Sequence, residues 1–326
     1  GEERPVQCRH GAMLPSFFLL EVRSSAHVSR ARFEHALRKK TTAAALALAL
    51  LAGCAGPSLD EVRALPPNAT PARFLLSFDD GPSTWQPYNP TRAILDTLAR
   101  NPVQPGIKAV FFLQTRDSRA GASKAGRALM RREHAEGHVL AVHSGSPRGH
   151  IDHMLLPDAE LDRTLADAEA DIAAITGRAP DLVRPPFWNY DARTLAAYRK
   201  RGLHMLLTDV SANDGVIYFW NISLRRRSHI RNALAELRER IAAGALPVVG
   251  GVIPLVVTFH DTNTFTAHHM EEYLRILTGE AADVGLVLAP KPFYDDAAAI
   301  ERAARVRADG WDLARDADRA SRPGGR

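Results

Sequence analysis

Cysteine is nearly missing from this sequence. Cys8 and Cys54 are the only two among 326 residues, which excludes a scaffold held together by several disulfide bonds. No internal repeat is visible. Apolar residues make up 45% of the chain and charged residues 24%, proportions that are ordinary for a globular protein with a sizeable core.

A strong charge of one sign is lacking from most of the chain. The net charge of +5 comes largely from residues 1–53, which hold eight Lys/Arg against four Asp/Glu, whereas the remainder holds 34 against 33. Nucleic-acid binding normally requires a basic surface on the folded part of a protein. We therefore expect no nucleic-acid partner.

The apolar run TTAAALALALL at 41–51 is too short to span a bilayer as a folded helix. It follows a basic stretch, RKK at 38–40, and ends in LAGC at 51–54. This arrangement resembles the lipobox of bacterial lipoproteins, which implies cleavage before Cys54 and lipidation of its thiol. The alternative is an incidental cysteine in an Ala-rich helix.

These features divide the chain into four parts. We interpret residues 1–53 as an upstream segment followed by a lipoprotein-type signal peptide, and residues 54–72 as a Pro-containing linker. Residues 73–295 are expected to form the main folded domain. Residues 296–326 are expected to form a C-terminal helix and a flexible tail.

From residue 73 onward, apolar, β-prone runs alternate with helical patterns. The runs lie at 73–78, 108–114, 138–143, 181–184, 203–209, 254–260 and 284–289. Helical patterns lie between them at 123–137, 158–177, 191–202 and 228–244. This alternation predicts an α/β fold with a parallel sheet covered by helices, and seven strands fit a closed or nearly closed barrel. In such barrels, catalytic groups lie at the C-terminal ends of the strands.

Polar residues stand at the C-terminal end of five of these runs. They are Asp79 and Asp80, His143, Arg184, Asp209 and His260. Their convergence on one rim predicts a single functional site. Because adjacent residues of an extended strand point to opposite sides, Asp79 and Asp80 are expected to diverge and to serve different purposes.

Five short motifs carry a family resemblance. SFDDGPS at 77–83, HSGSPRGH at 143–150, RPPFW at 184–188, TDVSAND at 208–214 and VVTFHD at 256–261 follow the order found in polysaccharide deacetylases. Residues 73–290 thus resemble carbohydrate esterase family 4, whose members share the NodB homology domain. The resemblance implies a distorted (β/α)7-type barrel of parallel strands and metal-dependent removal of acetyl groups from an N-acetylated polysaccharide.

The resemblance assigns Asp80 and two histidines to a divalent metal. Such ligands suit Zn²⁺, with Co²⁺ or Ni²⁺ as alternatives. The family places its two histidines four residues apart, whereas His143 and His150 are seven apart, and the intervening SGSPRG predicts a loop that brings the rings together. His150 is favoured because its distance to the helix at 158–177 matches the family, and His153 is the rival ligand.

Similarity to the family also implies the proton-transfer groups. Asp79 is the expected general base, clamped by Arg184, and His260 is the expected general acid. A carboxylate partner for His260 is expected at Asp209, which aligns better with the family motif than Asp214 does. Asp261 is a further candidate neighbour.

Pro186, Phe187 and Trp188 are the expected substrate-binding residues. The resemblance makes the backbone N–H of Phe187 an oxyanion donor, and the two aromatic rings suit a sugar-binding groove, with core packing as the alternative. Aromatic residues of the insert at 215–227 are further candidates for this groove. The partner is then an acetylated polysaccharide such as peptidoglycan, a chitin fragment or an exopolysaccharide. Alternatives are an O-acetyl esterase or other amide hydrolase, and a carbohydrate-binding relative without activity.

The lipobox interpretation predicts that the protein is held in the bacterial cell envelope by a lipid on Cys54. Ala55 after the cysteine indicates the outer membrane of a Gram-negative cell. The Cys54→Ala variant is expected to be soluble or to remain unprocessed, because the acylated thiol is lost. Membrane fractionation and gel mobility test this expectation, and a variant that behaves like the parent in both would contradict it.

Overall fold

The computed structural model describes residues 69–214 and 225–321, all within one compact unit that starts at Leu59. The segment predicted to be a signal peptide, Cys54, most of the predicted linker, the greater part of the 215–227 insert and the tail at 322–326 lie outside these residues. No helix within the described ranges is both long enough and apolar enough to cross a membrane.

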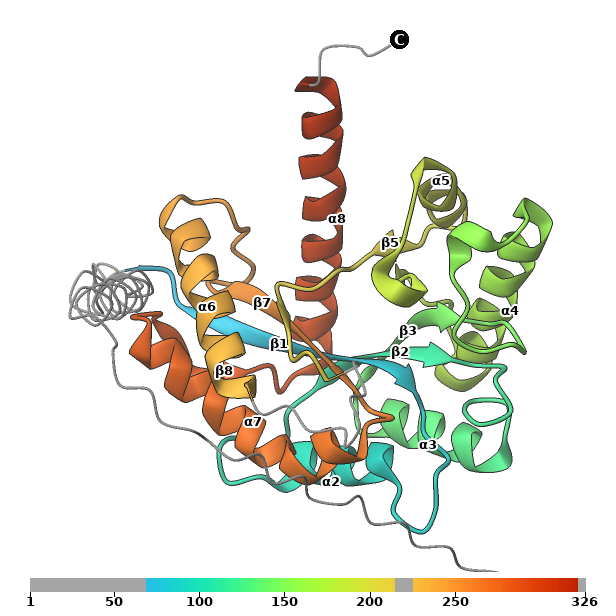
Figure 1. Cartoon of the computed structure of the whole chain (residues 1–326), viewed down its shortest axis with the longest axis horizontal. Coiled ribbons are helices and arrows are strands. Elements are labelled where there is room, and N and C mark those ends of the chain that lie inside the picture. Colours follow the sequence, from blue (N-terminus) through green and yellow to red (C-terminus); the bar gives the residue numbers. More distant parts are fainter. Residues whose placement is uncertain (1–68, 215–224, 322–326) are drawn as a thin grey trace, which may run out of the picture. The chain divides into compact units, whose positions relative to one another are not determined.

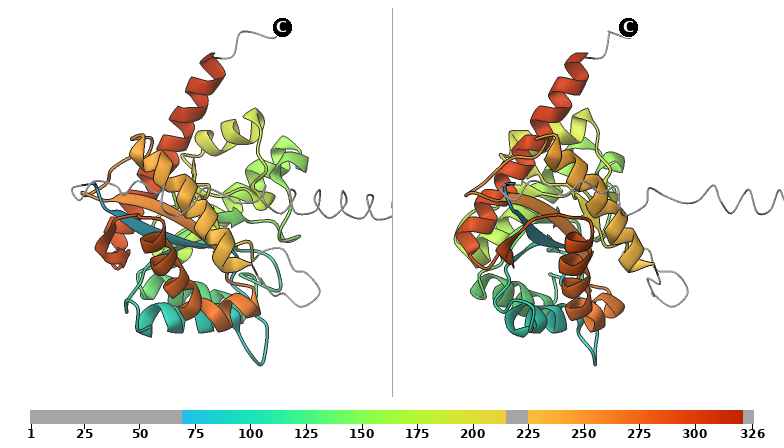
Figure 2. Two further views of the ribbon diagram at one scale, coloured as in Figure 1. Left: turned by 60° about the vertical axis from the view of Figure 1, so that its left-hand side comes forward. Right: turned by 90° about the vertical axis from the view of Figure 1, so that its left-hand side faces the viewer.

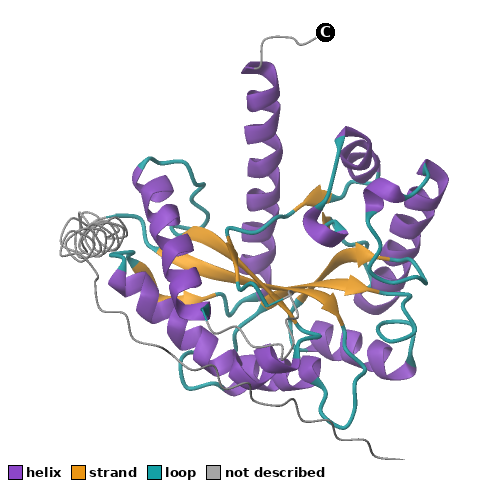
Figure 3. Cartoon of the chain, in the orientation of Figure 1, coloured by secondary structure: helices purple, strands orange, loops and turns teal. Residues whose placement is uncertain are grey.

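The centre of the described unit is an eight-stranded sheet whose strands pair in parallel (Figure 3). The strands are β1 (Ala72–Gly81), β2 (Ala109–Gln114), β3 (Val139–Ser144), β4 (Leu182–Val183), β5 (His204–Met205), β6 (Val210–Ser211), β7 (Ile253–His260) and β8 (Leu288–Phe293). Their order is β5-β4-β3-β2-β1-β7-β6, with β8 also pairing β1. The sheet is curled into a half-barrel, and the predicted (β/α)7-type class is confirmed.

Helices follow the strands, and four of them match the predicted helical patterns at 123–137, 158–177, 191–202 and 228–244 (Figure 1). They are α2 (Pro90–Arg100), α3 (Lys124–Ala135), α4 (Asp158–Thr176), α5 (Ala192–Lys200), α6 (Arg226–Ala242), α7 (Thr264–Asp283) and α8 (Ala297–Ser321), with short 3-10 turns η2 (His153–Leu155) and η3 (Pro186–Trp188). In α4 the apolar positions from Leu161 to Ile172 are buried, and the helix stops at Gly177, whose φ of 76° suits glycine.

The two faces of the sheet are covered by different helices (Figure 2). On the outer face, Phe74, Leu76 and Phe78 of β1 belong to the large apolar core shared with α2 through α7. On the inner face, Leu75 belongs to a second cluster with residues of α8, among them Ile300. The C-terminal helix therefore fills the lower part of the half-barrel, and the inner face is left to polar groups at the upper rim.

The run at 203–209 is not one strand. Within it only β5 is a strand, and β5 pairs with β4 at one edge of the sheet. β6 begins directly after the run and pairs with β7 at the other edge. The residues between them cross from edge to edge, with Leu206 N–H donating to Val183 O at 3.0 Å and Asp209 N–H donating to Val256 O at 2.9 Å. A local pattern cannot reveal this division because the two halves pair with strands far apart in the sequence.

Candidate metal centre and active site

The rim of the half-barrel is polar because side chains alternate along the strands. In β1, Leu75 faces the inner apolar cluster, and Ser77 and Asp79 follow on the same face. Asp79 pairs in register with His260 of β7. A cavity of about 350 Å³ opens at this rim, and it is lined by Asp79, Asp80, His143, His150, Phe187, Trp188, Ser211, Asn213 and His260.

Asp79 and Asp80 both line this cavity, so the expectation that they point to opposite sides is wrong. Asp80 has a φ of 72°, in the left-handed region that residues other than glycine rarely adopt. This conformation breaks the extended alternation at the strand end. A strained backbone at this position is the kind of feature that functional sites often carry.

Three of the predicted ligands meet in the cavity. His143 Nε2 lies 3.1 Å from Asp80 Oδ1, and His150 Nε2 lies 3.3 Å from the same oxygen. One ligand atom from each residue lies within 4.8 Å of the other two. His143 Nδ1 donates to the carbonyl oxygen of Arg184 at 2.8 Å, which leaves Nε2 facing Asp80.

The charges in this group favour the forms that bind metal. Burial alone would raise the pKa of Asp80, but the hydrogen bond and charge of His143, with contributions from His150 and His260, hold that pKa well below its usual range. Burial lowers the pKa of His150, so the neutral imidazole is favoured. An ionised carboxylate and neutral imidazoles are the forms that coordinate a divalent ion.

The loop between His143 and His150 brings the two rings together although they are seven residues apart in the sequence. Ser144 Oγ donates to Gly149 O at 2.8 Å, and Gly149 N–H donates to Ser146 O at 3.0 Å. Gly149 has a φ of 75°, and a Cβ atom there would lie 2.1 Å from Asp117 Oδ2. Glycine is therefore needed at this position for two reasons, its backbone conformation and the close approach of the carboxylate.

His153, the rival ligand, lies elsewhere. Its side chain is fully buried, and Nδ1 is 2.8 Å from the hydroxyl oxygen of Tyr198. Burial lowers its pKa to about 3, so it is a neutral histidine of the core. The structure brings His150, and not His153, to Asp80 and His143.

Asp79 is held on both carboxylate oxygens. Arg184 Nη1 donates to Oδ1 at 2.8 Å, and Trp188 Nε1 donates to Oδ2 at 3.0 Å. Asp79 and Arg184 are both buried, so their ion pair is little screened by solvent. The predicted clamp between Arg184 and Asp79 is confirmed as a contact.

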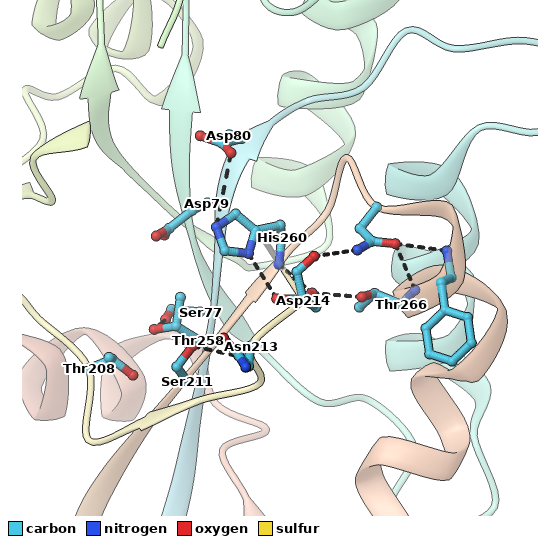
Figure 4. Close-up of polar contacts among 12 residues, drawn as sticks. Ser77, Asp79, Asp80, Thr208, Ser211, Asn213, Asp214, Thr258, His260 and Thr266 are labelled. Carbon is cyan, nitrogen blue, oxygen red and sulfur yellow. Dashed lines mark hydrogen bonds and ion pairs between the residues drawn. The ribbon is translucent and has the colours of Figure 1, made fainter. Parts of the chain in front are cut away.

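His260 is paired with Asp214. Its Nδ1 donates to Asp214 Oδ1 at 2.8 Å, while Thr266 Oγ1 donates to Asp214 Oδ2 at 2.6 Å (Figure 4). The other ring nitrogen, Nε2, lies 4.0 Å from Asp80 Oδ2. Burial lowers the pKa of His260, but the hydrogen bond and charge of Asp214, with Asp79 and Asp80, outweigh it and raise the pKa to about 9.

The expectation that Asp209 is the partner of His260 is wrong. Asp209 lies in the crossing segment between β5 and β6, where Oδ2 accepts from Val256 N at 2.9 Å. Its Oδ1 accepts from Arg307 of α8 at 2.5 Å and from Arg240 of α6 at 3.3 Å. This carboxylate thus ties the C-terminal helix to the sheet below the rim. Asp261 is not the partner either, since its Oδ2 accepts from Thr91 at 2.6 Å.

The predicted groove residues occupy η3. Phe187 is 58% exposed, which excludes core packing for this ring, and its centroid lies 4.2 Å from that of His150. Trp188 donates to Asp79, and Pro186 is buried. Phe187 and Trp188 both have a φ of 58°, and the N–H of Phe187 points to His150 Nε2 at 3.4 Å. This donor therefore faces the metal-ligand group.

Other residues at the site were not predicted. Ser211 and Asn213 line the cavity, and Gln114 donates to the carbonyl oxygen of Asp80 at 3.1 Å. Thr266, which supports Asp214, lies on α7. Ser211 and Asn213 stand in the TDVSAND motif and Gln114 ends a strand, so strand-end position was a usable signal for them, whereas Thr266 carries no such signal.

Comparison with known proteins agrees with this geometry. The family model for polysaccharide deacetylase matches residues 67–206, which include Asp79, Asp80, His143, His150 and Arg184, while His260 lies beyond. A chitin deacetylase from Pestalotiopsis sp. is 31% identical over 179 residues, covering 52% of this chain and 55% of that protein. A peptidoglycan-N-acetylglucosamine deacetylase from Bacillus cereus is 35% identical over 113 residues, covering 34% of this chain and 35% of that protein.

The chain thus spans about half, or less, of the length of these curated relatives. A solved structure, the chitin deacetylase from the fungal pathogen Colletotrichum lindemuthianum, has a similar fold, with a TM-score of 0.51 and 22% identity, covering 69% of this chain and 92% of that one. In sequence, residues 67–206, which supply most of the cavity, are similar to the polysaccharide deacetylase family.

Proposed function

We propose that this protein is a metal-dependent deacetylase that hydrolyses N-acetyl groups on sugars of an acetylated polysaccharide. The observation that carries the proposal is the meeting of three groups in one cavity. These are the Asp80–His143–His150 ligand set, the clamped carboxylate of Asp79 and the Asp214-paired imidazole of His260. Amide hydrolysis requires one group that activates the carbonyl, one that accepts a proton and one that returns it.

Charge balance supports a divalent ion at Asp80. Asp79 is paired with Arg184 and Asp214 with His260. Among the described residues, Asp80 has no arginine or lysine beside it: it faces the imidazoles of His143 and His150, the amide of Gln114 at 3.4 Å and His260 Nε2 at 4.0 Å. A carboxylate and two imidazoles form a donor set that Zn²⁺, Co²⁺ or Ni²⁺ accepts. Asp80, His143 and His150 would hold such an ion, which would supply Lewis-acid activation of the acetyl carbonyl and of water.

The two proton-transfer roles follow from the Asp79–Arg184 pair and the His260–Asp214 pair. Asp79 accepts a proton from water on the cavity side, and Arg184 and Trp188 keep its two oxygens in place. His260 donates its Nε2 proton to the leaving amine, because Nδ1 is committed to Asp214. The N–H of Phe187 lies beside the ligand group, where it can donate to the acetyl oxygen as negative charge develops.

An O-acetyl ester offers the same carbonyl chemistry and is the second candidate substrate. The same residues would act on it, so this choice depends on the sugar contacts. The two curated relatives are named for chitin and for peptidoglycan N-acetylglucosamine, which favours an N-acetylated sugar. A carbohydrate-binding protein without activity is disfavoured because base, acid and ligand residues are all in place.

We also infer that a lipid on Cys54 holds the enzyme in the cell envelope. This inference rests on the basic stretch, the short apolar run and the LAGC sequence alone. It agrees with a polymeric envelope substrate. The proposed function does not depend on it.

Acetate release tests the function. Purified protein with added Zn²⁺ is expected to release acetate from N-acetylglucosamine oligomers, and chelation is expected to abolish this release. Asp79→Asn is expected to lower the rate by about 10²–10⁴, the usual contribution of a general acid or base, while the bound metal is retained. Release only from O-acetylated sugars would select the second candidate, and near-normal turnover by Asp79→Asn would remove Asp79 from its role.

Metal analysis tests the ligand set. His150→Ala is expected to lose most of the zinc that the reconstituted parent retains after desalting, because one of its three ligands is gone. The control is His153→Phe, which keeps a ring against Tyr198 in the core and is expected to retain the parent's zinc. Zinc lost from the control and kept by His150→Ala would reverse the assignment.

The pH profile tests the pairing of His260. Asp214 raises the pKa of His260, and an acid must be protonated to act, so activity falls as the pH rises through that pKa. Asp214→Asn removes the charge, and the alkaline limb of kcat/KM is expected to move to lower pH by about one unit or more. Asp209→Asn, the control, is expected to leave the limb in place, and an unshifted limb in Asp214→Asn would contradict the pairing.

A further inference from the structure

One buried amide side chain, that of Gln114, faces the proposed metal ligand Asp80. Gln114 ends β2 and is 7% exposed. Its Nε2 lies 3.1 Å from the carbonyl oxygen of Asp80 and 3.4 Å from Oδ1 of the same residue. Both of these oxygens accept hydrogen bonds, so the amide presents its NH2 group to Asp80. Gln114 therefore contacts the backbone and the carboxylate of Asp80 at once.

The oxygen of the same amide lies against the loop that carries a second proposed ligand, His150. A Cβ atom on Gly149 would stand 2.9 Å from Gln114 Oε1, and Gly149 directly precedes His150. Because Gly149 has no side chain, the amide can approach the backbone of the loop. The Gln114 side chain thus lies between Asp80 and the loop of His150, in contact with both.

The backbone of Gln114 is fixed to its neighbours. Gln114 pairs in register with Ser144 of β3, and Ser144 directly follows His143. The carbonyl oxygen of Gln114 accepts from Gly121 N–H at 3.0 Å. The next amide, that of Thr115, donates to Ser144 O at 2.9 Å. The sheet therefore sets the place from which the side chain of Gln114 reaches Asp80.

Asp80 needs a support of this kind because its backbone is strained. The pairing of β1 with β2 is irregular between Phe78 and Gly81, and Asp80 has a φ of 72° within this irregularity. A left-handed conformation at a residue other than glycine costs free energy and persists only where surrounding contacts hold it. The hydrogen bond from Gln114 to the carbonyl oxygen of Asp80 is such a contact.

The neutrality of the amide also matters for metal binding. A lysine or arginine in its place would pair with the carboxylate of Asp80 and compete with a metal cation, whereas an acidic side chain would make that carboxylate harder to ionise. An amide N–H orients the carboxylate without cancelling its charge. The negative charge of Asp80 is thus left to the side that faces His143 and His150.

We propose that Gln114 is a positioning residue of the metal site, which holds Asp80 in its left-handed conformation and directs its carboxylate toward the two histidines. This inference rests on the proposed function, in which Asp80, His143 and His150 hold a divalent ion. Gln114 is not itself a ligand, and it takes no part in the proton transfers. Its loss therefore weakens metal binding without abolishing it.

Zinc affinity tests the role of Gln114. Gln114→Met keeps the length of the side chain and removes the amide, and it is expected to bind Zn²⁺ about 10- to 100-fold more weakly than the parent, the usual cost of losing a partner behind a metal ligand. Competition with a chromophoric chelator measures this dissociation constant without any substrate. Gln114→Asn draws the amide back by one methylene and is expected to weaken binding in the same direction, so it carries the test if Gln114→Met does not fold.

Gln104 provides a matched control. It is also 7% exposed, and its side chain bonds the backbone of Phe293, with Nε2 donating to the carbonyl oxygen at 2.8 Å and Oε1 accepting from the N–H at 2.9 Å. Gln104→Met is expected to lower the unfolding temperature, because two hydrogen bonds are lost, and to keep the zinc affinity of the parent. A loss of affinity that merely followed stability would appear in this variant as well.

The same measurement separates this inference from the proposed deacetylase function. A parent that binds Zn²⁺ but releases no acetate would contradict the function, while weaker zinc binding by the Gln114 variants would still support the positioning role. The inference is overturned if both Gln114 variants bind Zn²⁺ as the parent does, if Gln104→Met loses affinity equally, or if the parent binds no Zn²⁺.

Discussion

The rim of the half-barrel depends on one buried guanidinium, that of Arg184. Its side chain is fully buried, and its carbon centre lies 4.1 Å from the centroid of the Phe112 ring. The side chain donates to Asp79, and the backbone carbonyl oxygen of the same residue accepts from His143. A single residue therefore orients both the proposed base and a proposed metal ligand, from two different atoms.

The guanidinium of Arg184 also binds the segment that crosses the half-barrel from β5 to β6. Nε donates to Leu206 O at 2.8 Å and Nη2 to Leu207 O at 3.2 Å, two carbonyls in the segment that crosses from β5 to β6. Taking this cation out of water costs several kcal/mol unless it is paired and hydrogen-bonded. Asp79 supplies the charge and the crossing segment supplies acceptors. The position of the base and the closure of the half-barrel thus rest on one set of bonds.

Position at the C-terminal ends of parallel strands was enough to predict that Asp79, His143 and His260 share a rim. Alternation of side chains did not give the direction of Asp80, because its left-handed backbone breaks the period of two. Asp209 was misassigned because 203–209 resembles one strand, whereas its two ends pair at opposite edges of the sheet. Only long-range pairing decides which carboxylate meets His260, and local sequence does not encode it.

The two histidines of the proposed ligand set are held by different kinds of element, a buried strand and a loop. The His143 side chain is 1% exposed on a central strand, whereas the His150 side chain is 31% exposed at the end of a loop. That loop is ordered by Ser144, which lies next to His143 and bonds Gly149, which lies next to His150. The residues flanking the two histidines are therefore bonded to each other, and the longer spacing is compatible with one ion because a glycine lets the loop turn against Asp117.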